Sequence, residues 1–302
     1  MFEQINHLAL IGDLMQQMCV YLVVAYLLSK TPLFAPLMQV TVRLPDKLVC
    51  YVVFSGFCIM GTYLGFNIEG AIANTRAIGA VLGGLLGGPV VGLAVGLTGG
   101  MHRYSLGGFS ATACAVSTVT EGLIGGALHM VLLHRHQAER LLKPSIAFGT
   151  TLVAECAQML IILALAKPSE QAARLVAQIT LPMVLTNSLG AALFMRLILD
   201  RRETAEKYSI AFSAKALRIA ERSVGVLMQG FNAPNCSRLA SIIQEETGVG
   251  AVAITDCDKL LGFVGVGADH HLSGTPISSP HTLRAIADNA VVYADGVSVP
   301  YR

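Results

Sequence analysis

Charged residues are scarce in this sequence, and their scarcity excludes several classes of protein. Of the 302 residues, 13% are charged and 54% are hydrophobic, whereas soluble domains carry about 25% charged residues. About half of the charges lie after Asp200, so the first two-thirds of the chain are the most depleted. A net charge of +2, without a basic stripe interleaved with aromatic residues, gives no basis for nucleic-acid binding. These features predict an integral membrane protein with a smaller soluble segment at its C-terminus.

Motifs for metals, nucleotides and hydrolytic catalysis are also missing. None of the seven cysteines forms a CxxC pair and five lie in apolar stretches, so we expect reduced thiols without a disulfide framework or zinc site. The sequence has no P-loop, no GxSxG and no nucleotide-binding glycine motif between a strand and a helix. Asp269, His270 and His271 are consecutive with no partner cluster nearby, which favours an exposed turn over a metal site. We therefore predict no metal, no cofactor and no catalytic residue.

The long apolar stretches predict five membrane-spanning helices. Each stretch is near 20 residues, the length that crosses about 30 Å of hydrocarbon. The N-terminus lacks the basic region and cleavage site of a secretory signal, so the first helix is expected to remain in the protein. The predicted spans are Leu8–Leu28, Leu48–Phe66, Phe109–Leu133, Ala147–Ala166 and Ala172–Leu199.

A sixth apolar region, Arg76–Gly100, is interrupted by glycine and proline in the run GGLLGGP. Glycine costs about 1 kcal/mol per helical position relative to alanine, and proline removes a helix donor. The region is therefore either one kinked span or two half-helices that meet near Pro89. If the two half-helices return to the same side of the membrane, most of the lysine and arginine residues near the ends of the segments lie on the inner side. The positive-inside bias then favours five full crossings plus a broken hairpin over six crossings, with the C-terminus in the cytoplasm.

The last third of the chain is predicted to contain a linker and a small α/β domain. In the polar, helix-prone residues 201–222 and just beyond, Ile210, Leu217 and Val224 recur every seven residues, which predicts a parallel coiled coil in a homodimer. Because two heptads are few, a lone amphipathic linker helix is the alternative. Residues 223–302 have predicted helices at Cys236–Glu246 and Ser278–Asn289, and predicted strands at Ala251–Thr255, Leu260–Val266 and Ala290–Ala294.

Arg76 and Arg103 are the strongest candidates for a ligand site, because they bracket the predicted hairpin. If the hairpin returns to its starting side, both guanidinium groups face the same mouth. Two planar forks of donors that converge in this way form a carboxylate site, to which a half-helix N-terminus near Asn74-Thr75 could add backbone donors. In the alternative interpretation each arginine extends to the lipid headgroups.

The next span adds polar groups to this region. Cys114, Ser117 and Glu121 share one helical face at positions i, i+3 and i+7, although small polar residues in spans often only hold helices together. A charge inside a spanning helix costs about 2.5–3.5 kcal/mol on insertion scales, so Glu121 and Glu155 each require a partner or a function. Pairing with an arginine is the simplest expectation for both.

Several segments carry more specific sequence. They read IANTRAIGAVLGGLLGGPVVG, LTGGMHRYSLGG, GAVAITD, DHHLSGTPISS and VVYADG. Together they resemble the LytS-type sensor histidine kinases over essentially the whole chain. The resemblance implies a polytopic helix bundle at residues 1–200, a signalling linker helix at 201–222 and a truncated α/β GAF-like domain at 223–302. For pyruvate-responsive members it implies ligand contacts at Arg76, Arg103, Cys114 and Ser117.

Members of that family continue into a dimerising helix pair with an NPHFLFN-like phosphoacceptor box, followed by an ATP-binding domain. Neither is found in this sequence, so we expect the chain to be the sensor portion of a kinase that cannot autophosphorylate by itself. The resemblance also implies a LytTR-type response regulator as the partner of the missing kinase region.

The sequence thus predicts the input module of a two-component system in the bacterial inner membrane, which binds a small carboxylate, pyruvate above others. The alternative is a substrate-binding membrane subunit of a transporter, because transporters also place half-helices at midplane sites. A coiled-coil exit helix joined to a GAF-like domain argues against a transporter. A membrane enzyme with Cys114 as nucleophile lacks a nearby histidine on the same face.

Overall fold

The structure is a computed structural model that describes residues 7–38, 43–68 and 70–293. The chain divides into two compact units, Met1–Thr204 and Ala205–Arg302. The first unit is a bundle of helices, and the second combines helices with a two-stranded sheet.

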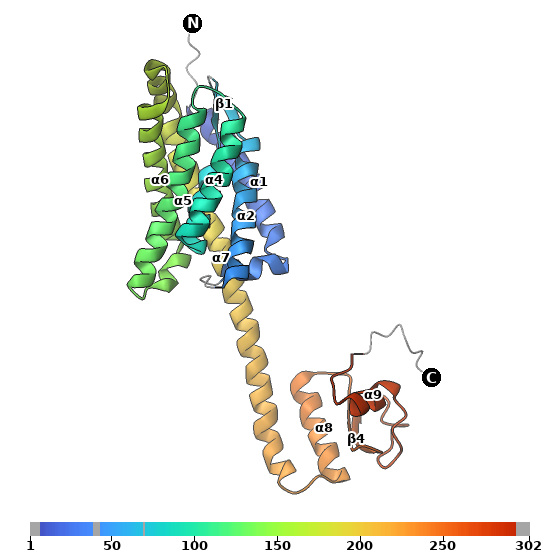
Figure 1. Ribbon diagram of the computed structural model, residues 1–302. Coiled ribbons are helices and arrows are strands. Elements are labelled where there is room, and N and C mark those ends of the chain that lie inside the picture. Colours follow the sequence, from blue (N-terminus) through green and yellow to red (C-terminus); the bar gives the residue numbers. More distant parts are fainter. Residues whose placement is uncertain (1–6, 39–42, 69, 294–302) are drawn as a thin grey trace. The chain divides into compact units, whose positions relative to one another are not determined.

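Five helices in the described part are long and apolar enough to cross a membrane. This confirms the five spans predicted from the apolar stretches, and the observed bounds lie within a few residues of the predicted ones at most ends. In the first unit these helices run side by side (Figure 1). They are α1 (His7–Leu28), α2 (Leu44–Tyr63), α5 (Ala111–His134), α6 (Pro144–Leu165) and α7 (Ser169–Leu227), and short 3₁₀ turns occupy η1 (Pro32–Met38) and η2 (Ala138–Leu142).

The glycine- and proline-rich region forms two shorter helices, α3 (Arg76–Gly87) and α4 (Pro89–Ser105). They meet at Gly88, whose φ of 86° lies in the region that favours glycine. The helices are antiparallel neighbours: a Cβ on Gly92 would lie 2.7 Å from the Cα of Gly84. The predicted half-helices that meet near Pro89 are therefore present, and they return on each other.

Glycine allows α5 to pack against the backbones of this hairpin. A side chain on Gly84 would collide with the carbonyl oxygen of Gly122, and one on Gly96 would lie 2.7 Å from the Cα of Val119. At these positions no Cβ atom separates the helices, so their backbones approach closely, as small residues permit between membrane helices. The run of glycines thus serves helix packing and fixes the position of α3 and α4 on α5.

A short β-hairpin connects α2 to α3. Its strands, β1 (Phe66–Ile68) and β2 (Ala71–Ala73), are antiparallel with Phe66 opposite Ala73. The sequence analysis did not predict this hairpin, because three residues per strand are too few for a recognisable alternation. The hairpin places Asn74 and Thr75 directly before the first turn of α3.

An aromatic cluster joins the first, second and last spans. The ring of Tyr21 lies 4.5 Å from that of Phe57, which in turn packs edge-on to Phe194 at 5.3 Å. Phe54 completes the group at 5.7 Å from Phe194. Tyr21, Phe54 and Phe194 are fully buried, and aromatic pairs of this kind add about 0.5–1.5 kcal/mol each beyond their buried area.

The second unit contains the C-terminal part of α7, then α8 (Ala233–Thr247), β3 (Ala251–Thr255), β4 (Leu260–Gly265) and α9 (Pro280–Asp288). The strands are antiparallel, with Ala251 opposite Gly265. The helices and the first two strands were predicted within a few residues. The predicted third strand is wrong for residues 290–293, which pair with neither strand, and Ala294 lies outside the described residues. A short apolar run becomes a strand only where it pairs with another strand, and a local sequence pattern does not reveal that pairing.

Candidate ligand-binding site

Arg76 is the first residue of α3, and its side chain is almost completely buried at 1% exposure. Its Nε donates a hydrogen bond to the hydroxyl of Thr118 on α5, at 2.6 Å. Its backbone N–H is held by the side-chain oxygen of Asn74, at 3.0 Å. The terminal Nη1 is buried and has no hydrogen-bond partner among the described residues. Arg76 therefore does not extend to the lipid headgroups, and it retains an unused donor inside the bundle.

Arg103 lies in the last turn of α4 and is also fully buried. Its Nη1 donates to the carbonyl oxygen of Gly107 at 2.7 Å, and its Nη2 donates to the hydroxyl of Ser110 at 3.3 Å. Gly107 and Gly108 have φ values of 71° and 95°, and this left-handed turn brings the chain back to the guanidinium group. The Nε of Arg103 is buried without an acceptor in the described part of the chain.

The two arginines lie at the same end of the hairpin and within electrostatic reach of each other. Cys114 lies near Arg103, and Ser117 follows Cys114 one turn later on α5. Both are buried, and the Ser117 hydroxyl donates to the Cys114 carbonyl oxygen at 3.0 Å. The structure thus places Arg76, Arg103 and Cys114 at the open end of the hairpin, and Ser117 lies buried one turn after Cys114 on α5.

Two buried glutamates lie in the surroundings of Arg76. Glu121 on α5 and Glu155 on α6 are fully buried, and both interact electrostatically with Arg76. The expectation that each pairs directly with an arginine is wrong for the described residues. Arg76 bonds to Thr118 instead, and Glu155 accepts a hydrogen bond from Asn187 at 2.5 Å. Both oxygens of Glu121 lack a hydrogen-bond partner in the described structure.

Asn187 on α7 was not identified from the sequence. Its Nδ2 donates to the carbonyl oxygen of Asn74 at 3.0 Å as well as to Glu155. Since Asn74 in turn holds the backbone of Arg76, one amide connects the last span to the start of α3. An amide inside an apolar span was the available signal, because such groups are costly in a membrane without partners.

The turn after β4 contains two polar residues that the sequence analysis singled out. Asp269 and His270 lie in an exposed turn, as predicted, with the His270 Nδ1 3.0 Å from an Asp269 oxygen. Their side chains are 86% and 68% exposed, so solvent hydrates both groups.

The comparisons with known proteins agree with this architecture. The family model described as the 5TMR of 5TMR-LYT matches residues 31–201. The sensor histidine kinase BtsS of Escherichia coli (strain K12) is 60% identical over 289 residues, covering 96% of this chain and 52% of that protein. The sensor protein LytS of Bacillus subtilis (strain 168) is 33% identical over 303 residues, covering 92% of this chain and 51% of its own.

More distant relatives show the same pattern. The sensor histidine kinase/phosphatase LytS of Staphylococcus aureus (strain Mu50) is 30% identical over 278 residues, covering 86% of this chain and 47% of that protein. No solved structure matches the chain. The chain spans about half the length of these relatives. It belongs to the 5TMR-LYT family of multi-pass receptors of the bacterial inner membrane, and it corresponds to the sensor portion of the LytS-type sensor histidine kinases.

Proposed function

We propose that this chain is the input module of a two-component histidine kinase and that it binds a small carboxylate, pyruvate above others. The observation that carries the proposal is the pair of buried arginines, Arg76 and Arg103, each with a guanidinium nitrogen that has no acceptor in the described structure. A buried donor without an acceptor costs about 1–3 kcal/mol. A ligand carboxylate would offset this cost at both arginines at once.

The surrounding groups suit a short 2-keto acid. Charge-assisted hydrogen bonds from the two guanidinium groups would hold the carboxylate, and Cys114 and Ser117 would contact the keto end. Pyruvate has six heavy atoms, so its binding free energy could reach roughly 9 kcal/mol at the ceiling of about 1.5 kcal/mol per atom. Micromolar affinity corresponds to about 8 kcal/mol and is therefore within reach.

The signal would leave the site through α7. Asn187 joins this helix to the residues that precede Arg76, so a ligand that shifts α3 would shift the population of α7 arrangements. In this proposal α7 delivers the signal to the cytoplasm. There Ile210, Leu217 and Val224 would pair with a second copy of the chain, and residues 223–302 would act as a GAF-like domain ahead of the kinase region. A LytTR-type response regulator would then receive the phosphoryl group.

Calorimetry on the purified full chain tests the ligand. Pyruvate is titrated beside lactate, acetate and the C4 dicarboxylate succinate at equal ionic strength. We expect micromolar binding of pyruvate and weaker binding of acetate, which lacks the keto oxygen. If none of these carboxylates binds more tightly than chloride, the arginine pair is not a carboxylate site and the proposal fails.

A further inference from the structure

A second cationic site lies between α1 and α7, at the end of the bundle where α1 finishes. A cavity of about 500 Å³ opens there between the two helices. We propose that this cleft binds the phosphate of an anionic phospholipid headgroup. The site is separate from the candidate pyruvate site and does not depend on the proposed function.

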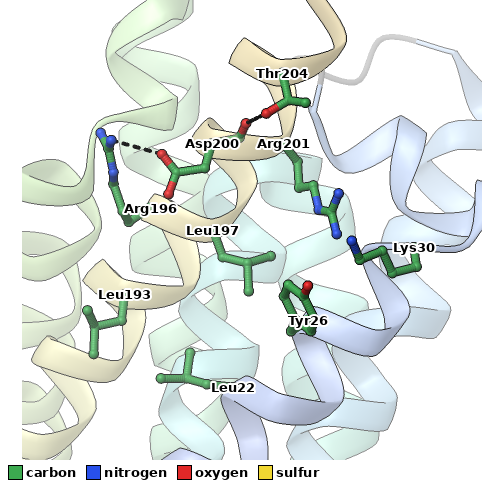
Figure 2. Close-up of a pocket in the computed structure, with 9 residues that line it drawn as sticks. All are labelled: Leu22, Tyr26, Lys30, Leu193, Arg196, Leu197, Asp200, Arg201 and Thr204. Carbon is green, nitrogen blue, oxygen red and sulfur yellow. Dashed lines mark hydrogen bonds and ion pairs between the residues drawn. The ribbon is translucent and has the colours of Figure 1, made fainter.

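Two cations converge in this cleft without a counter-charge. The Lys30 Nζ lies 5.0 Å from the centroid of the Tyr26 ring, and the Arg201 guanidinium carbon lies 5.4 Å from the same centroid. Figure 2 shows the two side chains directed toward each other beside that ring. Neither cation forms an ion pair with a carboxylate in the part of the chain that the structure describes. Like charges placed this close repel each other, so an anion between them would be stabilised.

The Arg201 side chain is held in position by one hydrogen bond and keeps a donor without an acceptor in the described structure. Its Nε donates to the Ser29 hydroxyl at 2.9 Å, and that hydroxyl donates to the Tyr26 carbonyl oxygen at 2.6 Å. The Nη2 of Arg201 is buried without a hydrogen-bond acceptor among the described residues. A guanidinium group that is held at one nitrogen and free at another can offer a directed donor to a phosphate oxygen.

The remaining charges of the cleft do not cancel this pair. Asp200 forms an ion pair with Arg196 one helical turn away, at 2.8 Å, and Figure 2 shows this pair directed to the other side of α7 from Lys30. With Asp200 engaged by Arg196, the positive charges of Lys30 and Arg201 stay uncompensated. The cleft therefore complements a phosphate group.

The lining favours a lipid over a free anion. Leu22, Leu193 and Leu197 form an apolar wall beside the cations (Figure 2). Because α1 and α7 are both long and apolar enough to cross a membrane, this wall would face acyl chains and the cations would lie at headgroup level. Basic pockets between spanning helices on the cytoplasmic side bind anionic headgroups in this way, and aromatic rings such as that of Tyr26 are common at the same depth.

Native mass spectrometry of the full chain, released from nanodiscs that mix phosphatidylglycerol with phosphatidylcholine, tests the proposal. We expect the wild-type chain to retain phosphatidylglycerol in preference to phosphatidylcholine. A double variant with Lys30→Gln and Arg201→Gln should lower this retention about tenfold, as expected for the loss of one charge-assisted hydrogen bond or more. Arg135→Gln removes one positive charge from an exposed loop residue and should leave the retention unchanged.

Further variants and a competing anion decide whether the cleft binds a phospholipid, a free anion or neither. Asp200→Asn should raise the retention of phosphatidylglycerol, because it frees Arg196 and removes the one carboxylate of the cleft. Equal retention by the wild type and the double variant, with both chains folded by circular dichroism, would overturn the proposal. If inorganic phosphate displaces phosphatidylglycerol as effectively as dispersed phosphatidylglycerol does, the cleft is a free-anion site and the lipid assignment is wrong.

Discussion

Arg76 donates a hydrogen bond from its Nε to the hydroxyl of Thr118, 2.6 Å away on α5. The hydroxyl itself donates to the carbonyl oxygen of Cys114, at 2.8 Å. The orientation of the guanidinium fork therefore depends on a threonine that is not expected to touch the ligand. Thr118 is a positioning residue in the proposed site.

Thr118→Val keeps the shape of the side chain and removes the acceptor for Arg76. We expect pyruvate affinity to fall about tenfold, because a hydrogen bond to a charged group contributes about 1.5–3 kcal/mol. Thr120→Val is the matched control, since the Thr120 hydroxyl is exposed and bonds only to its own helix. Calorimetry on both variants makes the comparison, and equal losses would show that Thr118 has no special role.

Arg103→Lys keeps the positive charge but loses the planar fork of donors. We expect at best millimolar affinity for pyruvate, and the same result for Arg76→Lys and for either alanine variant. Lys167→Ala, in the connection between α6 and α7, should bind like the wild type. Wild-type affinity in Arg103→Lys would contradict the carboxylate clamp, because a simple point charge would then suffice.

The close packing of glycine backbones predicts opposite effects for two glycine substitutions. Gly84→Ala places a Cβ against the Gly122 carbonyl group, and overpacking of this kind costs about 1–3 kcal/mol. Gly149→Ala on α6 meets nothing within 4 Å and should be neutral, or stabilising by up to about 1 kcal/mol. Thermal unfolding in detergent micelles should therefore show a lowered midpoint for Gly84→Ala alone.

The exposed heptad stripe predicts a homodimer that can be crosslinked. Ile210 and Leu217 are 69% and 70% exposed in the single chain, and such apolar side chains at seven-residue spacing fit a parallel coiled coil. With the exposed Cys19, Cys156 and Cys257 replaced by serine, Leu217→Cys should form disulfide-linked dimers in membranes. Lys215→Cys, an exposed position that lies outside the stripe, should not. Equal crosslinking at both positions would favour the lone linker helix.

The ionic contact between α7 and α8 predicts a pH dependence. Hydrogen bonds from Arg222 at 2.8 Å and Arg218 at 2.9 Å lower the pKa of the Glu246 carboxyl from its ordinary value. A carboxyl whose pKa is lowered by folding stabilises the folded state above its unfolded pKa, near about 4.3 for glutamate. This contribution is lost as the pH falls through the lower, folded pKa.

Hydrogen–deuterium exchange checks this prediction. After correction for intrinsic exchange rates, the protection of α8 amides should fall below a pH of about 4 in the wild type. Glu246→Gln should show low protection at every pH, with no step in this range. Glu221→Gln changes an exposed carboxylate of α7 that has no ion pair in the described structure, and should retain the wild-type step.

Hydropathy alone located the five spans, because a run of about 20 apolar residues has few other stable arrangements. The same reasoning separated the last span from the linker at Asp200, whereas the structure has one helix from Ser169 to Leu227. Polarity changes at that point, but no glycine or proline stops the helix there. The boundary that the sequence predicted at Asp200 is a change from apolar to polar residues within one continuous helix.

The site was partly accessible from the sequence. Arg76 and Arg103 stood out because arginines beside an apolar hairpin are rare, and the glycine run showed that the hairpin could close. Thr118 and Asn187 did not stand out, since their partners Arg76, Asn74 and Glu155 lie on other segments of the chain. Only the packing of α3, α6 and α7 shows which polar groups meet.

The turn at Gly88 also sets the electric field at the proposed site. Because α3 and α4 are antiparallel, the positive end of the α3 dipole and the negative end of the α4 dipole lie together at the open end of the hairpin. Arg76 reinforces the positive end, whereas Arg103 compensates the negative one. An anion between them is drawn toward α3, by about 0.3–1 kcal/mol for one helix end. If a 2-keto acid binds as proposed, the hairpin would draw its carboxylate toward Arg76, while Arg103 still holds the same group and the keto end lies toward α5.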